Sequence, residues 1–220
     1  MFELFFMRII LLLAIVTAFC TSCNNSGKGK TFCDTTCNSD TIKFSGSEPF
    51  NQAVAISIKD CEPDSLKWTH KGLLNERQIL FRQFVTQSVR LNKSAISSAF
   101  QDTTNVWLAF NDCITGRGYI FKLPYRTGNQ ITTISGALNS FDPKFSVDPD
   151  LRAYTDRGNI YVVDVTTGKE AQMTFKKEYE MDFNNIHKSI DTINITKQRI
   201  YVKLIDKDGN EIPFEKKIDL

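Results

Sequence analysis

Cysteine is the residue type through which this 220-residue sequence could do the most chemistry. After Cys23 four cysteines remain, at Cys33, Cys37, Cys61 and Cys113. A thiol can be acylated, oxidised to a disulfide or bound to zinc. Two histidines, His70 and His187, accompany them, and no set of cysteines and histidines after Cys23 has the spacing of a complete zinc site. We therefore predict no metal ion.

The other polar residues form no recognisable catalytic arrangement. A nucleophile-elbow motif and a complete phosphate-binding loop are both missing from the sequence. Five aspartates stand beside turn residues, where a carboxylate usually accepts hydrogen bonds from nearby backbone N–H groups: Asp142, Asp148, Asp150, Asp156 and Asp164. Residues 206–210, DKDGN, predict a hairpin turn for the same reason. The sequence predicts no catalytic residues and no cofactor.

The first 23 residues have the features of an export signal. Arg8 precedes an apolar run, Ile9–Phe19, that would rise only about 16 Å as a helix, too short for a bilayer core of ~30 Å. The end of this stretch resembles a bacterial lipobox, in which small residues precede a lipidated cysteine, here Cys23. We predict a lipoprotein signal peptide over residues 1–22 and a lipid on Cys23; an ordinary secretory signal is the alternative.

The residues after the anchor predict a location in the cell envelope. Residues 23–40 are small and polar, as in a flexible tether, and the seven positions after Cys23 contain no acidic residue. Because an acidic run there directs some lipoproteins to the cell surface, we expect attachment to the outer membrane, facing the periplasm. The acidic, apolar lead before Met7 also predicts that translation starts at Met7.

Disulfide bonds are expected in such an oxidising compartment. Four cysteines can pair in three ways. We favour Cys33–Cys37, which closes a loop within the tether, together with Cys61–Cys113, which would join two repeat units. Four free thiols are the alternative.

Short strands separated by turn residues fill the sequence after Asp40. Alternation of apolar and polar residues, with β-branched and aromatic enrichment, marks each strand. The predicted strands are residues 41–44, 53–59, 65–70, 78–85, 95–100, 105–110, 118–123, 130–135, 144–147, 151–155, 159–165, 171–175, 189–195, 199–205 and 211–218. A short helix within residues 73–85 is the only helical alternative. The hydrophobic content of 41% suffices for a packed core.

The strands group into units of about 40 residues, a sign of a repeat fold. Three such units are residues 94–135, 143–175 and 188–218. The stretch KFSVDPDLRAYTDRGNIYVVDVTTGKEAQMTF, residues 144–175, carries Phe-Ser, Ala-Tyr, Gly-Asn, Tyr-Val-Val-Asp and Thr-Gly in that order. It resembles the repeat of TolB-like and dipeptidyl-peptidase IV N-terminal-type β-propellers, which are WD40-like. The resemblance implies blades of antiparallel strands.

The predicted fold is therefore all-β, built from antiparallel β-meander repeats over residues 41–220. About four units would form a small β-propeller-like domain, with a β-sandwich as the alternative. Pairing of residues 41–44 with residues 211–218 would help to close the ring. Packed inward positions are expected at Trp107, Ala109, Phe121, Tyr161 and Val163. A ligand would lie on a rim formed by the turns 111–118, 156–159 and 206–210.

Five triplets have an aspartate, then Ser or Thr, then an apolar residue or Thr. This pattern resembles a bacterial protein O-glycosylation signal. The candidate acceptors are Thr35, Thr41, Ser65, Thr103 and Thr192.

Charge excludes one class of partner. The 27 basic and 25 acidic residues give a net charge of +2, and no basic cluster suggests a nucleic-acid surface. The first functional hypothesis is a non-catalytic envelope lipoprotein with a binding or scaffold role. Its partners would be the membrane, through the lipid, and an envelope protein, a peptide or a glycan. The alternative is an enzyme accessory or hydrolase in the periplasm, such as a peptidase-associated propeller.

Overall fold

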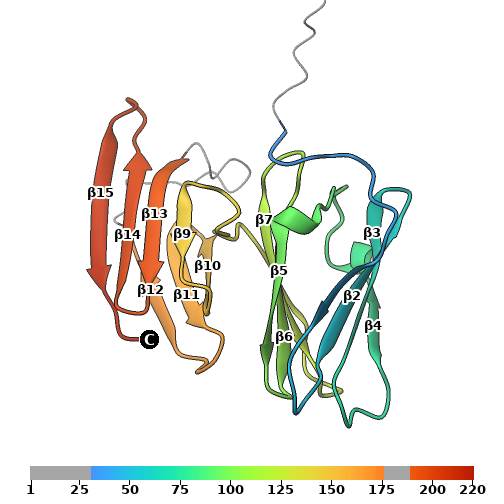
Figure 1. Cartoon of the computed structure of the whole chain (residues 1–220). Coiled ribbons are helices and arrows are strands. Elements are labelled where there is room, and N and C mark those ends of the chain that lie inside the picture. Colours follow the sequence, from blue (N-terminus) through green and yellow to red (C-terminus); the bar gives the residue numbers. More distant parts are fainter. Residues whose placement is uncertain (1–30, 176–188) are drawn as a thin grey trace, which may run out of the picture. The chain divides into compact units, whose positions relative to one another are not determined.

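Four β-sheets make up the described part of the chain. The computed structural model describes residues 31–175 and 189–220, and one compact unit spans Phe32–Leu220. Sheet A has the order β1 (Ile42–Ser45), β2 (Ala53–Lys59), β3 (Glu62–Thr69), β4 (Arg77–Leu80). Sheet B has the order β5 (Ile96–Gln101), β6 (Asn105–Asn111), β7 (Gly118–Pro124), β8 (Thr132–Ser135). Both are antiparallel meanders (Figure 1).

The second half of the unit forms sheets C and D. Sheet C has the order β10 (Leu151–Asp156), β11 (Asn159–Asp164), β12 (Glu170–Met173). Sheet D has the order β15 (Glu211–Lys217), β14 (Arg199–Ile205), β13 (Ile190–Thr196), β9 (Phe145–Val147). The prediction of an all-β fold is confirmed. Two short 3₁₀ helices lie among the described residues, η1 (Phe81–Gln83) and η2 (Lys93–Ala95).

Each predicted strand falls on an observed strand, because local alternation and turn chemistry specify these elements well. The largest difference is the segment 78–85, where the strand ends at Leu80 and η1 follows. The β10–β11 hairpin shows the turn chemistry. Asp156 pairs with Asn159, and the two residues between them, Arg157 and Gly158, both have positive φ (47° and 78°). Two positive φ values are what a type I′ hairpin turn requires.

A turn with the sequence Asp-x-x-Thr-Gly occurs twice, once between two strands of sheet B and once between two strands of sheet C. In the β6–β7 turn the Asp112 carboxylate accepts the Thr115 N–H (3.0 Å), and in the β11–β12 turn the Asp164 carboxylate accepts the Thr167 N–H (3.0 Å). The glycine that follows each threonine donates its N–H to the carbonyl of that same aspartate, at 2.7 and 2.8 Å. Sheets B and C therefore share a local repeat.

The prediction that residues 143–175 form one repeat unit is wrong, because their strands do not belong to a single sheet. Strand β9 does not join β10–β12; it pairs in parallel with β13, with Phe145 opposite Ile193 and Val147 opposite Ile195. The backbone hydrogen bonds Ile193 N to Lys144 O (2.9 Å) and Asp148 N to Ile195 O (3.0 Å) extend this ladder. Sheet D thus takes its edge strand from the chain that precedes sheet C.

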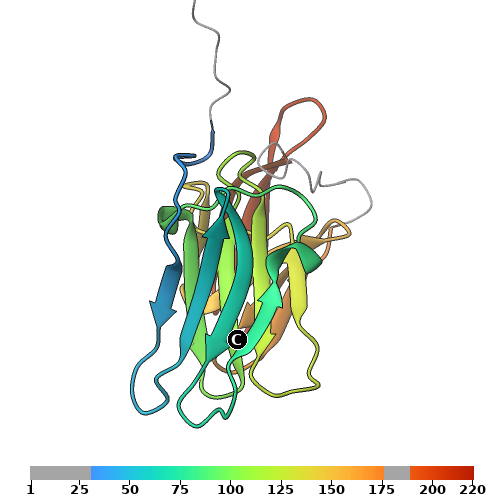
Figure 2. The same ribbon diagram turned by 90° about the vertical axis from the view of Figure 1, so that its right-hand side faces the viewer.

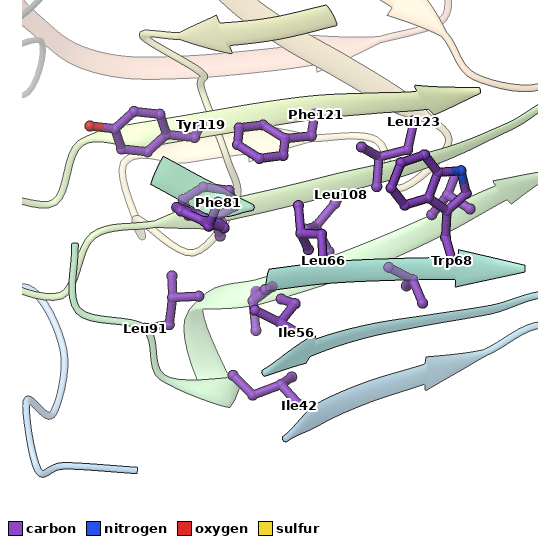
Figure 3. Packing of buried hydrophobic residues seen from close by; sticks show 14 of the residues in the cluster. Ile42, Ile56, Leu66, Trp68, Phe81, Leu91, Leu108, Tyr119, Phe121 and Leu123 are labelled. Atoms are coloured by element: carbon purple, nitrogen blue, oxygen red, sulfur yellow. The ribbon is translucent and has the colours of Figure 1, made fainter. Parts of the chain in front are cut away.

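Hydrophobic clusters join the sheets in chain order. The first, between sheets A and B, includes Leu66 and Trp68 from sheet A and Leu108 and Phe121 from sheet B (Figure 3). The Trp68 indole N–H is satisfied there by the carbonyl of Pro124 (3.0 Å). A second cluster joins sheets B and C, and a third joins sheets C and D. None of these three clusters combines residues of sheets A and D.

Four of the five predicted inward positions are buried: Trp107, Ala109, Phe121 and Val163. They do not share one axis, because Phe121 belongs to the cluster between sheets A and B and the other three to the cluster between sheets B and C. Tyr161 is only half-buried and stacks on Tyr154, with ring centroids 5.3 Å apart. These four buried residues are therefore packed between sheets, as expected, but they do not line a common interior of a ring.

The expected pairing of residues 41–44 with residues 211–218 is wrong. Strand β1 pairs with β2 and is an edge of sheet A, as Figure 2 shows, and β15 pairs with β14 and is an edge of sheet D. Pro213 and the charged residues Glu215 and Lys217 lie on β15. Proline and charge protect an edge strand against further pairing, so β15 is suited to remain an edge.

Candidate functional site

A cavity of about 420 Å³ lies between sheet B and the segment that leads into sheet C. Its lining residues are Ser97, Ser98, Ala99, Ala109, Leu138, Asn139, Ser140, Phe141, Val147, Asp148, Pro149, Asp150, Leu151, Arg152 and Ala153. Small-molecule sites are typically concave, mostly apolar and carry a few well-placed polar groups. We call this cavity the Arg152 cavity, because its one buried cationic side chain is Arg152.

Arg152 is 8% exposed although it carries a positive charge. Its Nη1 donates to the backbone carbonyls of Pro149 (3.0 Å) and Leu151 (2.8 Å). Its Nε is buried and has no hydrogen-bond partner within the described residues. Burial lowers the pKa of the Arg152 guanidinium, and the charge of Asp150 partly opposes that shift. A buried cation of this kind is costly unless an anion compensates it.

The carboxylates near Arg152 are already engaged elsewhere. Asp148 accepts the N–H of Asp150 (3.1 Å), and the Asp150 carboxylate forms an ion pair with Lys197 (3.4 Å). No ion pair found among the described residues joins either of them to Arg152. The guanidinium therefore faces the cavity without a carboxylate of its own.

The predicted structural use of the turn aspartates is also seen at Asp142, which accepts the N–H of Lys144 (2.9 Å). Asp112, which was not singled out in the sequence, additionally accepts the N–H of the distant Arg90 (2.9 Å). Asp206 accepts the N–H groups of Asp208 and Asn210 in the β14–β15 hairpin, as expected of a turn. Asp156 is exposed.

Asp164 is the most buried of the predicted aspartates. It is 0% exposed, accepts two backbone N–H groups through Oδ1, and its Oδ2 lies 3.2 Å from the Lys197 ammonium. Burial alone raises the pKa of its carboxyl, but the hydrogen bonds from Thr167, Thr166 and Lys197 outweigh burial and hold the pKa below its usual value. The group is ionised and structural, not poised for proton transfer.

In the remaining wall of the Arg152 cavity, hydrogen bonds to the backbone hold the side chains of Asn139 and Ser140. The Asn139 amide donates to the carbonyls of Phe110 (3.0 Å) and Tyr119 (3.4 Å). Ser140 is bonded through its hydroxyl to both the N–H and the carbonyl of Val147. Ser97, on β5, is half-buried and lies on the same face of sheet B as Ala99 and Ala109, which line the cavity, whereas the Ser98 side chain lies on the opposite face.

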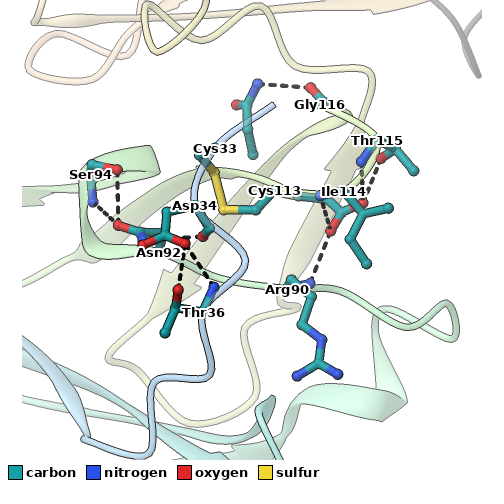
Figure 4. Close-up of a disulfide and its surroundings, with 12 residues drawn as sticks. Cys33, Asp34, Thr36, Arg90, Asn92, Ser94, Cys113, Ile114, Thr115 and Gly116 are labelled. Atoms are coloured by element: carbon teal, nitrogen blue, oxygen red, sulfur yellow. Dashed lines mark hydrogen bonds between the residues drawn. A yellow bond between two sulfur atoms is a disulfide. The ribbon is translucent and has the colours of Figure 1, made fainter. Parts of the chain in front are cut away.

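The four predicted disulfide cysteines are all bonded, but the favoured pairing is wrong. The bridges are Cys33–Cys113 and Cys37–Cys61, with Cα–Cα distances of 4.6 and 5.0 Å. Cys33–Cys37 and Cys61–Cys113 do not form. Both observed bridges run from the N-terminal segment to a hairpin turn. Cys113 lies between β6 and β7, and Figure 4 shows its bridge to Cys33; Cys61 lies between β2 and β3. The segment before β1 is thereby fixed to two sheets.

Hydrogen bonds reinforce the attachment of this N-terminal segment. The N–H groups of Phe32 (2.8 Å) and Cys33 (3.3 Å) both donate to the carbonyl of Cys113, and the Asn92 amide donates to the carbonyl of Asp34 (3.2 Å). The Asp34 carboxylate accepts the hydroxyl and the N–H of Thr36, which lowers the pKa of Asp34. Residues from Phe32 onward therefore belong to the folded unit and are not a free tether.

The O-glycosylation candidates differ in accessibility. Thr35, Thr41 and Thr103 are exposed. Ser65 is 5% exposed and its hydroxyl lies 2.7 Å from that of Ser57. Thr192 is half-buried and donates to Asp191 (2.8 Å). Only the first three present a free surface to a modifying enzyme.

Several predicted features lie elsewhere or beyond the described residues. Cys23, Met7 and His187 fall outside them. His70 is half-buried, contacts the Tyr125 ring edge-on with ring centroids 4.7 Å apart, and donates through Nδ1 to the carbonyl of Lys71 (2.8 Å). Neither 156–159 nor 206–210 nor 111–118 lines the Arg152 cavity, so the expected rim position of the site is not supported.

The described ranges 31–175 and 189–220 contain no group of three or more His, Cys, Asp or Glu side chains placed to hold a metal ion. Nor do they contain a helix with the length and apolar character needed to cross a membrane.

Arg152 is the functional candidate that the sequence prediction missed. The sequence did contain a signal, because Arg152 stands in a predicted strand between two apolar residues, Leu151 and Ala153. All three are buried, so the strand is covered on both faces. An arginine at such a position is unusual unless it is paired.

Comparison with known proteins gives no relative. A scan against models of protein families finds no match for the chain, and a search of curated proteins finds none either.

Proposed function

We propose that the protein is a non-catalytic lipoprotein of the cell envelope that binds a ligand in the Arg152 cavity. One observation carries this proposal: the cavity contains a buried guanidinium without a counter-ion, while the nearby carboxylates are engaged in turns and ion pairs. Such a site is equipped to hold an anion.

The proposed location is supported by two kinds of feature. Both disulfides join distant parts of the chain, and stable disulfides are typical of exported proteins. The lipobox-like residues before Cys23 suggest how the exported protein is held. We place the protein at the outer membrane, facing the periplasm, with a lipid on Cys23.

We also propose that the four sheets are degenerate blade-like repeats, related to those of TolB-like and dipeptidyl-peptidase IV-type propellers. The repeated Asp-x-x-Thr-Gly turn of sheets B and C supports this, as does the order in which the hydrophobic clusters join the sheets. An experimental structure in which sheets B and C superpose no better than unrelated hairpin meanders would contradict the repeat.

The anchor is tested by labelling cells with a fatty-acid analogue. The wild-type protein should carry the label and sediment with the outer membrane, whereas Cys23→Ser should be unlabelled and released into the periplasmic extract. Label that persists in Cys23→Ser would overturn the assignment.

The absence of turnover is tested on the released Cys23→Ser protein. Panels of peptidase, esterase and glycosidase substrates should remain unchanged, while the protein retains an envelope ligand or partner. The alternative, a hydrolase or enzyme accessory, would instead show hydrolysis that a single substitution such as Asp148→Asn or His70→Ala abolishes.

A further inference from the structure

The Arg152 cavity has a chemistry that narrows its ligand to one class. We infer that the cavity binds an acidic monosaccharide, that is, a small ring compound with one carboxylate and several hydroxyl groups. This inference rests on the proposed binding function and names its ligand. Three properties of the cavity carry it: its cation, the sign of the charge at its wall, and its mixture of hydroxyl and apolar lining.

The cation selects an anionic ligand. Arg152 is buried to more than nine-tenths, its Nη1 is held by the carbonyls of Pro149 and Leu151, and its Nε has no partner within the described residues. Those two carbonyl bonds fix the plane of the guanidinium. A hydrogen bond from a fixed guanidinium to a carboxylate is about twice as strong as one between neutral groups.

The wall charges favour a single negative charge over two. Asp148 and Asp150 line the same cavity as Arg152. The charge of Asp150 is partly balanced by Lys197, but the carboxylate remains 60% exposed. A phosphate dianion would meet repulsion from both aspartates, whereas a carboxylate carries one charge that can be directed at Arg152. The same aspartates can accept hydrogen bonds from ligand hydroxyl groups.

The rest of the lining suits a hydroxylated ring. Ser97 offers a hydroxyl group that can donate and accept, on the sheet B side. Apolar surface comes from Ala99, Leu138 and the half-buried ring of Phe141. An aromatic ring provides a flat apolar surface for the C–H face of a sugar, while its hydroxyl edge meets serine and aspartate. The volume of about 420 Å³ lies within the range of small-molecule sites.

Calorimetry on the Cys23→Ser chain tests this inference with three ligands of one ring size. The probes are D-glucuronate, the neutral methyl ester of D-glucuronate, and D-glucose 6-phosphate. Glucuronate should bind, and the ester should bind about 10- to 100-fold more weakly because it loses a charge-assisted hydrogen bond. The phosphate should also bind more weakly than glucuronate. Equal affinity for acid and ester, or tighter binding of the phosphate, would overturn the inference.

Variants locate the binding site. Arg152→Gln should reduce glucuronate affinity about tenfold or more while leaving ester binding unchanged, and Arg152→Lys should recover part of the loss. Arg126→Gln is the matched control, because Arg126 is exposed and does not line the cavity. If Arg152→Gln fails to fold, the comparison of glucuronate with its methyl ester on the unaltered protein still tests whether the cavity binds the carboxylate. Ser97→Leu, which removes a hydroxyl from the wall, should weaken both acid and ester.

The outcomes separate this inference from the proposed function. Binding of acid and ester with equal affinity, both lost in Ser97→Leu, would contradict the carboxylate ligand and leave a binding protein. Failure of all three probes to bind would overturn the inference, whereas the retained envelope partner would still support the proposed function. Hydrolysis of a bound glucuronide would contradict the proposed function itself.

Discussion

The carbonyl of Gly118 accepts the N–H groups of both Gly136 (2.9 Å) and Ala137 (3.1 Å), so the chain leaving sheet B lies directly against the start of β7. A Cβ at position 118 would collide with the backbone carbonyl oxygen of Ala137. Backbone, unlike a flexible side-chain end, cannot move aside without breaking these bonds. Glycine is thus required at this point by close approach rather than by a left-handed φ.

Gly118→Ala should therefore destabilise the fold by roughly 2–4 kcal/mol, in the range of substitutions that force a core shift. Urea unfolding followed by tryptophan fluorescence measures the change. Gly72→Ala is the comparison: Gly72 has φ of 92° with nothing near its Cβ position, so only backbone strain of about 1–2 kcal/mol applies. A Gly118→Ala loss no greater than that of Gly72→Ala would contradict the close-approach argument.

The disulfide pairing can be mapped directly. Cleavage of the non-reduced protein at Asp34 separates Cys33 from Cys37, so the two bridges give different linked peptides in mass spectrometry. We expect Cys33 linked to Cys113 and Cys37 linked to Cys61. Peptides that link Cys33 to Cys37 would show that the N-terminal segment is attached differently.

The two bridges should also differ in their effect on stability. Replacing both cysteines of a pair by serine leaves no odd thiol. The Cys33/Cys113 pair spans 80 residues and the Cys37/Cys61 pair spans 24, so loss of the first should cost more, within roughly 3–5 kcal/mol for either. Denaturant midpoints of the two double variants test the order, and the reverse order would refute it.

The Asp164–Lys197 ion pair should make stability depend on pH in acid. The folded-state pKa of Asp164 is lowered, so its ionised form stabilises the fold above the unfolded pKa of about 3.9, and this contribution disappears as pH falls through the folded pKa. Asp164→Asn keeps an acceptor for the turn but removes the charge. It should cost roughly 1–3 kcal/mol at pH 7.

Below about pH 4 the difference in unfolding free energy between wild type and Asp164→Asn should shrink. Urea midpoints at pH 7, 4 and 3 measure this trend. Asp156→Asn serves as the exposed control on the same sheet. A constant difference across the three pH values would mean that the charge of Asp164 does not contribute.

Glycan attachment, if it occurs, should follow exposure. Intact-peptide mass spectrometry of protein from the native envelope should find modification among Thr35, Thr41 and Thr103, all exposed, and none on Ser65. The Ser65 hydroxyl is buried against Ser57 in a β2–β3 pair. A glycan on Ser65 would require modification before folding.

Local features of the fold were predictable from the sequence, because they depend on neighbours in the chain. The Gly158 turn and the apolar alternation around Val162 specify a hairpin without any distant contact. The aspartate turns followed the same logic, since Asp164 bonds residues two and three positions ahead.

Partners distant in the chain were not predictable. Phe145 stands next to β10 in sequence but pairs with Ile193, and no periodicity indicates that choice. The cysteine pairing failed for the same reason: Cys37 is close to Cys33 in sequence, yet Cys61 is brought to it by the β2–β3 turn. The Arg152 cavity depends on two sheets at once, so spacing along one strand could not reveal it.

The two bridges also determine how the domain would respond to a mechanical pull on its N-terminus. Force from the proposed anchor would enter the fold at Cys33 and pass through sulfur into the β6–β7 turn, while Cys37 passes it into the β2–β3 turn. Without them the pull would reach β1 first and unzip that edge strand from β2 one hydrogen bond at a time. With them the load is shared by sheets A and B together, so the pull no longer acts on one edge strand alone.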